Sequence, residues 1–462
     1  MHDRDTSGID DTLMRIGTYA ATLDYASLST STRAATVRHV MDTIGCAIGG
    51  FHGGPCIAAR KIAASAAAEN GATVIGQKGR AALEQAAFAN GCMARYLDFN
   101  DAYLAVSGGH TSDIIPSILA AAESRNASGK DVILAMHIGY EVYSAVADAT
   151  LIRERGWDCT YLPALGAAAA IGRLFKMTPA QIANAVSMTA TANVPLGVTR
   201  VGELGNWKGM ASAWTAMAAL WSARLAELDV TGPPRAIEGD RGMWDLVTGT
   251  YDLSMLGLPV DGRTAMERTA YKFYIAEYSA QAPAYAFAEL YKEGLRPDDI
   301  ESIRLGSYFV ATSEIGDRSK WDPQNKETAD HSIVFIIAAI LRDGTVTQDT
   351  YSQESILDPS LRPTMNKISV YEDPALTAKF PQKLENVIDI VLNDGRKIHK
   401  VTDHAPGHPD HPLNDEQLGQ KFRESARNTI SAAKADHYLD RLMGIETLAD
   451  IAPLMAAFGD FS

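Results

Sequence analysis

The feature that most constrains the fold of this chain is a change in hydrophobic pattern near residue 270. Before it, from about residue 12 to 268, apolar residues recur with a helical period in long stretches rich in Ala and Leu, for example at 81–97, 131–149 and 209–228. Strand-like alternation is nearly absent from this part. Because an amphipathic helix must bury its apolar face against a neighbour, these stretches predict a large helical domain.

After residue 270 the sequence alternates between apolar and polar residues. Segments 298–309, 366–373 and 386–402 have the two-residue period of half-buried strands, and Asp394-Gly395 divides the last of them as a hairpin turn would. The run HSIVFIIAAILRDG has the pattern of a helix within this region. These features predict a mixture of helices and strands.

Helical pattern returns near the C-terminus in 414–434, where Asn414 is placed to cap the first turn. The sequence therefore predicts a mainly α protein with two domains, for which 462 residues are long enough. We expect residues 1–268 and 405–462 to form the helical domain, made from both ends of the chain. Residues 269–404 are expected to form a smaller, inserted α+β domain.

The charge of the chain limits its partners. The formal net charge is −14, with 42 Lys and Arg against 56 Asp and Glu. This balance argues against a nucleic-acid partner, because binding to nucleic acid needs basic clusters that displace counterions. A small anionic substrate is compatible with it, provided that Lys or Arg side chains gather locally in an otherwise negative protein.

Three patterns concern location. The longest apolar run, Ile333 to Leu341, is too short to cross a bilayer, and the charged N-terminal stretch MHDRDTSGIDD lacks the apolar core of a signal peptide. The four cysteines follow neither a CxxC pair nor a regular disulfide framework. We therefore expect a cytoplasmic protein with reduced thiols and no membrane contact.

Ionisable residues gather in RYLDFNDAYLAVSGGHTSDIIP, residues 95–116. Asp98 and Asp101 are three apart, so they share a face if the preceding helix continues. His110 follows two glycines, which would let the backbone turn closely and direct the imidazole into a cleft, where its ordinary pKa of about 6.5 suits proton transfer and Asp98 could orient it. The alternative is structural: a loop histidine without function, with one of residues 111–113 capping the next helix.

Three cations are further candidates. Arg200, Lys208 and Lys272 each lie beside aromatic and glycine-rich sequence. A lysine in a partly apolar cleft could pair with a substrate carboxylate or act as an acid, since its pKa moves readily on burial. A solvated surface lysine is the commoner explanation for any one of them.

The segment DHAPGHPDHP holds three histidines, His404, His408 and His411. Prolines in the same stretch prevent the regular helix that would align imidazoles as metal ligands, so we expect no metal site there. The Gly-rich phosphate-binding patterns are missing as well: the sequence has neither GxxxxGKS nor GxxxxGKT, and no GxGxxG after a strand. Nothing in the residues supports nucleotide binding.

Several segments resemble one known family, in the expected order. GCMARYLDFNDAYLAVSGGHTSD is similar to the segment characteristic of the MmgE/PrpD family. Further family-like segments are RGWDCTYLPALGAAAAIGRLF, RVGELGNWKGMASA, YKFYIAEYSAQ, ETADHS, VYEDPALTAKF and VLNDGRKI. The resemblance spans nearly the whole chain. The family includes 2-methylcitrate dehydratase, cis-aconitate decarboxylase and iminodisuccinate epimerase.

The resemblance implies a helical domain with an α+β lid, a homodimer, and an active site in the cleft between the domains without metal or organic cofactor. Four residues match the family's acid–base and carboxylate-binding set: Asp98, His110, Lys208 and Lys272. Four more candidate substrate-binding residues lie in the same family-like segments: Arg200, Asp101, Cys159 and Tyr278.

The chain departs from the family pattern at three places. Ala102 stands where members often have a threonine, Asp158-Cys159 where they usually have a histidine, and Ser279 where a further histidine is expected. Losing a second histidine removes one proton donor or acceptor. More of the proton transfer would then fall to His110, and a substrate or reaction different from that of the named members stays open.

The family's reactions share a carbanion-like state beside a carboxylate, which fixed cations and a base of matched pKa stabilise in a closed site. We expect a hydro-lyase resembling 2-methylcitrate dehydratase that acts on a small tricarboxylate or hydroxy acid, because the Asp98 to His110 spacing and the EDPALTA segment favour that branch. Two alternatives stay open. One is a cis-aconitate-type decarboxylase or an epimerase of the same fold, and the other is a catalytically silent binding protein.

Overall fold

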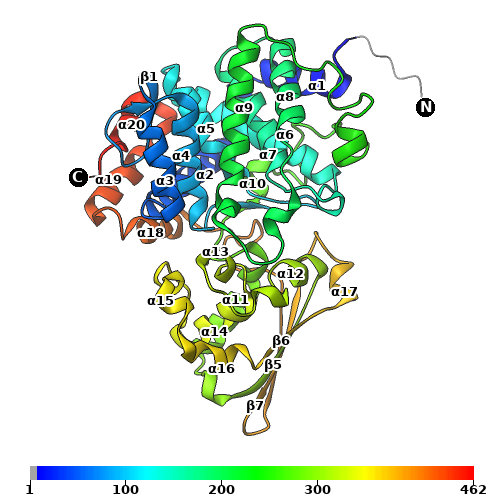
Figure 1. Ribbon diagram of the computed structural model, residues 1–462, viewed down its shortest axis with the longest axis vertical. Coiled ribbons are helices and arrows are strands. Elements are labelled where there is room, and N and C mark those ends of the chain that lie inside the picture. The colour runs from blue at the N-terminus through cyan, green and yellow to red at the C-terminus, as the bar shows by residue number, and fades with distance from the viewer. Residues whose placement is uncertain (1–7, 462) are drawn as a thin grey trace. The chain divides into compact units, whose positions relative to one another are not determined.

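The computed structural model describes residues 8–461, and the chain forms two compact units (Figure 1). Unit 1 comprises Met1–Gly197, Gly209–Ala270 and Asn414–Ser462, and unit 2 comprises Val198–Lys208 and Tyr271–Leu413. The sequence did not indicate that the segment Val198–Lys208 belongs to unit 2. The domain boundaries that we expected stay a prediction. Residues 1–7, part of the stretch from which we argued against a signal peptide, lie outside the described residues.

Unit 1 is predominantly helical, which confirms the mainly α class. The predicted stretches 131–149 and 209–228 are helices α6 and α9. The helices of this unit are α1 (Asp11–Thr22), α2 (Thr30–Gly49), α3 (Gly54–Ser65), α4 (Leu83–Tyr96), α5 (Ile115–Ser124), α6 (Gly129–Ala149), α7 (Tyr161–Leu174), α8 (Pro179–Ala192), α9 (Ala211–Glu227), α10 (Ala265–Arg268), α18 (Asp415–Ala426), α19 (Ala432–Met443) and α20 (Ala452–Ala457).

Helix α7 lies at the centre of unit 1. It packs against α6, α8 and α9, and every residue from Tyr161 to Gly172 is buried. The sequence of α7 is rich in Ala and Gly because its neighbours approach closely. A Cβ atom added at Gly166 would lie 2.2 Å from the carbonyl oxygen of Gly139 on α6, so this crossing requires glycine.

Two small antiparallel sheets interrupt the helices of unit 1. Strands β1 (Ala67–Thr73) and β2 (Arg80–Ala81) form one, and β3 (Ala102–Tyr103) and β4 (Thr269–Ala270) form the other. We did not predict these strands. β2, β3 and β4 have two residues each, too few to show a periodicity, and the sequence AAENGAT of β1 does not alternate between apolar and polar residues. The pairing of Ala102 with Ala270 fixes the segment that follows α4.

Unit 2 contains a four-stranded sheet in the order β6-β5-β7-β8. β5 (Ile300–Ser307) pairs in parallel with β6 (Ile368–Glu372) and antiparallel with β7 (Asn386–Leu392), which forms a hairpin with β8 (Lys397–Thr402). The three strand segments and the hairpin are confirmed. Gly395 turns the chain with φ +84°, a left-handed conformation that favours glycine.

Helices α11 and α14 pack together in unit 2, and α11 also contacts β7 and β8. The predicted buried helix is α14, whose residues Ile333 to Leu341 are all buried. In the part of the chain that the structure describes, no helix is both long and apolar enough to span a membrane. The helices of unit 2 are α11 (Gln281–Lys292), α12 (Phe309–Glu314), α13 (Lys326–Ala329), α14 (Ile333–Asp343), α15 (Gln353–Ile356), α16 (Arg362–Met365) and α17 (Pro374–Thr377).

Candidate functional site

The ionisable cluster at residues 95–116 begins where α4 ends. The helix stops at Tyr96, and Asp98 has φ +53°, a left-handed conformation that residues other than glycine seldom adopt. The preceding helix therefore does not continue to Asp98, so the condition for Asp98 and Asp101 to share a helical face is not met. The left-handed residue costs about 1 to 2 kcal/mol and turns the chain so that the Asp98 carboxylate forms an ion pair with Arg95.

Arg95 is the centre of this cluster. Its buried guanidinium donates through Nη1 to the carboxylate of Asp98 and, at 3.4 Å, to Oδ1 of Asn100. Its Nη2 lies 2.8 Å from Nε2 of His110, and its Nε lies 3.9 Å from Oδ1 of Asp113. We did not predict Arg95, although its position three residues before Asp98 was a signal for this ion pair.

His110 is held through both nitrogens of its ring. Nδ1 lies 2.6 Å from the backbone carbonyl oxygen of Asp101, and Nε2 lies 3.8 Å from Oδ1 of Asp98 in addition to its contact with Arg95. The side chain is 13% exposed, whereas those of Arg95 and Asp98 are at most 1% exposed. His110 is therefore the member of this group of three that solvent reaches.

Of the two glycines before His110, Gly108 permits the close backbone approach that we predicted, whereas the neighbours of Gly109 are side chains. A Cβ atom at Gly108 would lie 2.6 Å from the carbonyl oxygen of Tyr103. A Cβ atom at Gly109 would lie 3.4 Å from Sγ of Cys159, which is buried. Cys159 thus packs beside the loop that carries His110.

Asp101 lies inside a second network of unit 1. Its Oδ1 accepts hydrogen bonds from the backbone N–H and the hydroxyl of Ser112, at 2.9 and 2.6 Å. Its Oδ2 accepts from the Tyr140 hydroxyl at 2.7 Å and lies 3.0 Å from Nδ1 of His39. Burial would raise the pKa of Asp101, but these donors outweigh burial and lower it. Both carboxylate oxygens of this fully buried residue are engaged by the protein itself.

The capping role suggested for residues 111–113 is wrong. These residues form a single 3-10 turn, Thr111–Ile114, and α5 begins after Ile114 without a side-chain cap. The Asp113 carboxylate accepts a hydrogen bond from the Asn100 side chain at 3.0 Å instead. The polar residues here serve the network around Arg95.

The C-terminal segment supports the same region from α18. Lys421 lies 2.7 Å from the carboxylate of Asp42 and donates to the carbonyl oxygen of Phe99 at 2.9 Å. Burial raises the pKa of Asp42, and Lys421 opposes this shift. The contact ties a helix from the end of the chain to the turn that follows α4, and no local sequence signal indicated it.

In unit 2, Lys208 takes part in a cluster around Asp330. The Lys208 ammonium lies 3.0 Å from Oδ1 of Asp330, and the Lys326 ammonium lies 2.8 Å from Oδ2. Nδ1 of His331 lies 2.7 Å from Oδ1. Burial alone would raise the pKa of Asp330, but the three partners outweigh it and hold this pKa well below its usual range.

We did not predict Asp330, Lys326 or His331. Lys326 and Asp330 are four residues apart, the spacing of a helical ion pair, which was the signal available in the segment that contains ETADHS. Nothing in the sequence indicated that Lys208 would join them.

The other predicted residues of unit 2 lie in loops and short turns. Lys272 is fully buried. The carbonyl oxygen of Arg200 lies 3.4 Å from the ammonium of Lys320, a buried lysine whose pKa burial lowers. Tyr278 begins the turn Tyr278–Ala280, and burial, with a smaller effect from Glu277, raises the pKa of its hydroxyl.

The three histidines of 404–411 lie near one another in unit 2. The ring centroids of His404 and His408 are 5.2 Å apart, and those of His404 and His411 are 5.9 Å apart. Nδ1 of His404 lies 2.6 Å from the carboxylate of Asp403. Our expectation that this segment holds no metal stays a prediction.

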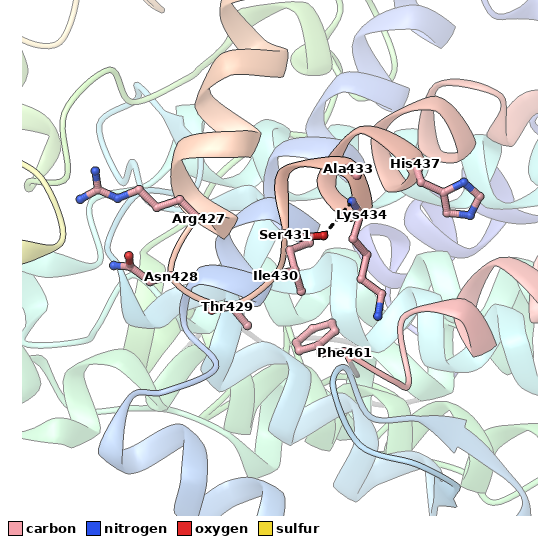
Figure 2. Close-up of a pocket in the computed structure, with 9 residues that line it drawn as sticks. All are labelled: Arg427, Asn428, Thr429, Ile430, Ser431, Ala433, Lys434, His437 and Phe461. Atoms are coloured by element: carbon pink, nitrogen blue, oxygen red, sulfur yellow. Dashed lines mark hydrogen bonds between the residues drawn. The ribbon is translucent and has the colours of Figure 1, made fainter.

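A surface pocket of about 760 Å³ lies elsewhere in unit 1 (Figure 2). It is lined mainly by the turn between α18 and α19 and by the first residues of α19. The side chains of Arg427, Lys434 and His437 point in different directions there (Figure 2). The pocket contains none of the predicted site residues.

Comparison with known proteins identifies relatives of this chain. Models of the MmgE/PrpD N-terminal domain and the MmgE/PrpD C-terminal domain match residues 14–256 and 274–443. The 2-methylcitrate dehydratases of Salmonella typhimurium (strain LT2) and Escherichia coli (strain K12) are each 30% identical over 399 residues, which cover 80% of this chain and 80% of each relative. The 2-methylcitrate dehydratase of Cupriavidus necator is 28% identical over 449 residues, 89% of this chain and 91% of the relative.

Proposed function

The chain belongs to the MmgE/PrpD family and is a lyase of the dehydratase type, and we propose that its substrate is 2-methylcitrate or a closely related small tricarboxylate. We further propose that the reaction needs neither a metal ion nor an organic cofactor, and that the active form is a cytoplasmic homodimer. The reaction is supported by similarity, over most of the chain, to relatives that are named 2-methylcitrate dehydratase. The residues of the two units support the assignment of roles.

The observation that carries the proposal is the setting of His110. An imidazole titrates near neutral pH, and this one is the partly exposed member of an otherwise buried network. We assign it the role of general base, which removes the proton from the carbon next to a substrate carboxylate. Asp98 orients the imidazole. Asp101 takes a positioning role rather than the substrate contact expected from the sequence, because its oxygens already accept protein hydrogen bonds.

The cations of unit 2 suit the other half of the reaction. The proton abstraction leaves negative charge beside a carboxylate, which Lys208, Lys272 and Arg200 would stabilise. As the carbon–carbon double bond forms, the carbon–oxygen bond breaks and the hydroxyl leaves as water after accepting a proton. We assign that proton to Tyr278 or Lys272. The raised pKa of Tyr278 keeps its hydroxyl protonated at neutral pH, as an acid requires.

A direct test uses the purified full-length protein after treatment with a chelator. Incubation with 2-methylcitrate, and separately with citrate, should produce an unsaturated acid that is detected by its near-ultraviolet absorbance. Absence of turnover with any hydroxy acid would contradict the dehydratase proposal. Activity lost with the chelator and restored by a metal ion would contradict cofactor independence alone.

The same samples separate the alternatives. A decarboxylase would release carbon dioxide from an unsaturated tricarboxylate, and an epimerase would change optical rotation without new absorbance. A silent binding protein would show a ligand-induced rise in melting temperature without turnover, and this rise would be unchanged in His110→Ala.

A further inference from the structure

The two hydrogen bonds of His110 determine where its proton lies. Nδ1 is 2.6 Å from a backbone carbonyl oxygen, that of Asp101, and a carbonyl oxygen only accepts. Nε2 is 2.8 Å from Nη2 of Arg95, and a guanidinium only donates. Nδ1 therefore carries the hydrogen, and Nε2 presents its lone pair.

We infer that Arg95 is a positioning residue that holds His110 as the neutral base with Nε2 as the proton-accepting nitrogen. The inference deepens the proposed function and rests on it where it treats His110 as the base. Arg95 suits this role because a guanidinium stays protonated at any pH at which the protein is folded. Asp98 and Asn100 accept from its Nη1, which aims Nη2 at the imidazole.

The backbone at Asp98 is a separate observation in support. The residue adopts φ +53°, although it is not glycine, and strained residues persist where the surrounding structure demands them. This conformation sets the Asp98 carboxylate against both Arg95 and the ring, 3.8 Å from Nε2.

Arg95 and Asp98 have opposite effects on the ring. The positive charge of Arg95 disfavours protonation of Nε2, whereas the negative charge of Asp98 favours it and stabilises the imidazolium once it forms. The Nε2 lone pair accepts from Arg95, so Arg95 must release this hydrogen bond before the substrate proton can move to Nε2. The Nδ1–H bond to the Asp101 carbonyl oxygen is kept, so the ring does not need to rotate.

Other titratable or charged groups of unit 1 also face this loop. Asp113 lies against Arg95, and Arg153 donates to the carbonyl oxygen of Gly108 at 3.0 Å. The Tyr143 hydroxyl and the Cys159 thiol lie beside Gly109. These groups contact Arg95 or the backbone of the loop, whereas Arg95 itself contacts the ring nitrogen.

The first test observes directly which ring nitrogen of His110 carries the hydrogen, and it does not depend on measuring enzyme activity. In the full-length protein with ¹⁵N-labelled histidine, a ¹⁵N–¹H spectrum distinguishes protonated from unprotonated ring nitrogens, and His110→Gln identifies the signals of His110. At neutral pH we expect a hydrogen on Nδ1 and none on Nε2. A hydrogen on Nε2, or on both nitrogens, would overturn the inference even if the enzyme dehydrates its substrate. Conversely, the expected spectrum would support it even if no substrate is turned over.

The second test removes the guanidinium. In Arg95→Met we expect His110 to populate both tautomers and its titration midpoint to rise by about one pH unit or more, with the acid limb of kcat/KM moving in the same direction. Arg153→Met is the matched control, since it removes a guanidinium that donates to the backbone of the same loop, and it should leave the tautomer unchanged.

An unchanged tautomer and titration midpoint in Arg95→Met would contradict the inference. If that variant does not fold, Arg95→Lys replaces it. Its single ammonium keeps the charge but cannot reproduce the fork that joins Asp98, Asn100 and the ring, so mixed tautomers are expected again. A single Nδ1–H tautomer in Arg95→Lys would show that charge alone suffices, and would overturn the positioning role.

Discussion

The two charged clusters of this molecule are assembled in different ways. In unit 1, Arg95, Asp98 and His110 come from one short stretch, and a single left-handed residue folds that stretch onto itself. In unit 2, Lys208 meets Asp330 across 122 residues of sequence. A cluster of residues that are close in sequence can therefore be found from residue types and spacing. A cluster of residues that are far apart in sequence depends on the tertiary packing that brings their segments together.

The clusters also differ in how their charges are arranged. In unit 1, the guanidinium of Arg95 lies against the carboxylates of Asp98 and Asp113. In unit 2, the ammonium groups of Lys208 and Lys326 both lie against the carboxylate of Asp330. We assign proton transfer to unit 1 because its cluster holds the partly exposed imidazole of His110, and carboxylate binding to unit 2 because it holds the candidate lysines.

The largest expected effect tests the proton-transfer assignment of unit 1. Replacing His110 with Ala should lower kcat by about two to four powers of ten while the protein stays folded, because a general base contributes on that scale. The matched control is His437→Ala, an exposed histidine on α19, which should keep full activity. Steady-state kinetics and melting temperature are measured for both variants. Equal activities of the two variants would remove His110 from the mechanism.

The next effect tests the carboxylate-binding assignment of unit 2. Lys272→Ala should cost about two to three powers of ten in kcat/KM, because it removes a fixed cation from beside the developing charge. Lys292→Ala changes an exposed lysine of α11 and serves as the control. A Lys272→Ala protein with the kinetics of the wild type would contradict the assignment of Lys272 to carboxylate binding.

A third change removes the contact of Lys421 with Asp42 and Phe99, next to the unit 1 cluster, and leaves His110 unchanged. Lys421→Met leaves the Asp42 carboxylate buried without its ammonium partner and should lower the free energy of unfolding by about 3 to 5 kcal/mol. Denaturant unfolding measures the loss, and Lys434→Met, which changes a partly exposed lysine of α19, is the control. The double variant Asp42→Asn/Lys421→Met should regain part of the stability. Lack of any recovery would mean that the lost packing, and not the unpaired charge, causes the effect.

The smallest expected effect compares two buried carboxylates by pH. Burial raises the pKa of Glu141 in unit 1 to about 7, against the opposing effects of the Ala265 N–H and Arg268. A carboxyl with a raised pKa in the folded state binds more protons there than in the unfolded chain. Its contribution to stability is therefore lost as pH rises from about 4.5 to about 7. Asp330 in unit 2, whose pKa is lowered, has the opposite sign and loses its contribution as pH falls.

Glu141→Gln should consequently raise the free energy of unfolding by up to about 3 kcal/mol above pH 7 and change it little near pH 4.5. Thermal melts across this pH range measure the difference, with the exposed Glu416→Gln as control. A gain of the same size at both ends of the range would show that burial of the charge is not its cause.

The parts of the fold that could be predicted are those with a local cause. Helices α6, α9 and α14 follow from apolar periodicity, and Asn414 caps α18 as expected, with its side chain accepting from the Gln417 N–H. The end of α4 at Tyr96 was missed, because the sequence RYLDFND contains no glycine or proline to mark it. The strain at Asp98 is compensated by contacts that a residue pattern does not reveal.

The candidate site, like the fold, was predictable where its residues lie close together in sequence. His110 and its two glycines stand out in the sequence. In the structure, His110 bonds to the carbonyl oxygen of Asp101, and both glycines lie close to neighbouring atoms. Arg95 was missed because buried arginines are rare and the residue lies within a helical pattern. The enclosure of Asp101 by Tyr140 and His39 could not be predicted, because it depends on helices from other parts of the chain.

The sequence by itself determined the long helices, the strands of the four-stranded sheet and the short stretch that concentrates ionisable residues, since these follow from the spacing of residue types along the chain. Only the tertiary structure decided which partner each charge receives. Lys421 reaches Phe99 across 322 residues and Lys208 reaches Asp330 across 122, and both contacts exist because separate elements pack together. A buried charge must find a partner, but its partner is chosen by the fold of the whole unit and not by its neighbours in sequence.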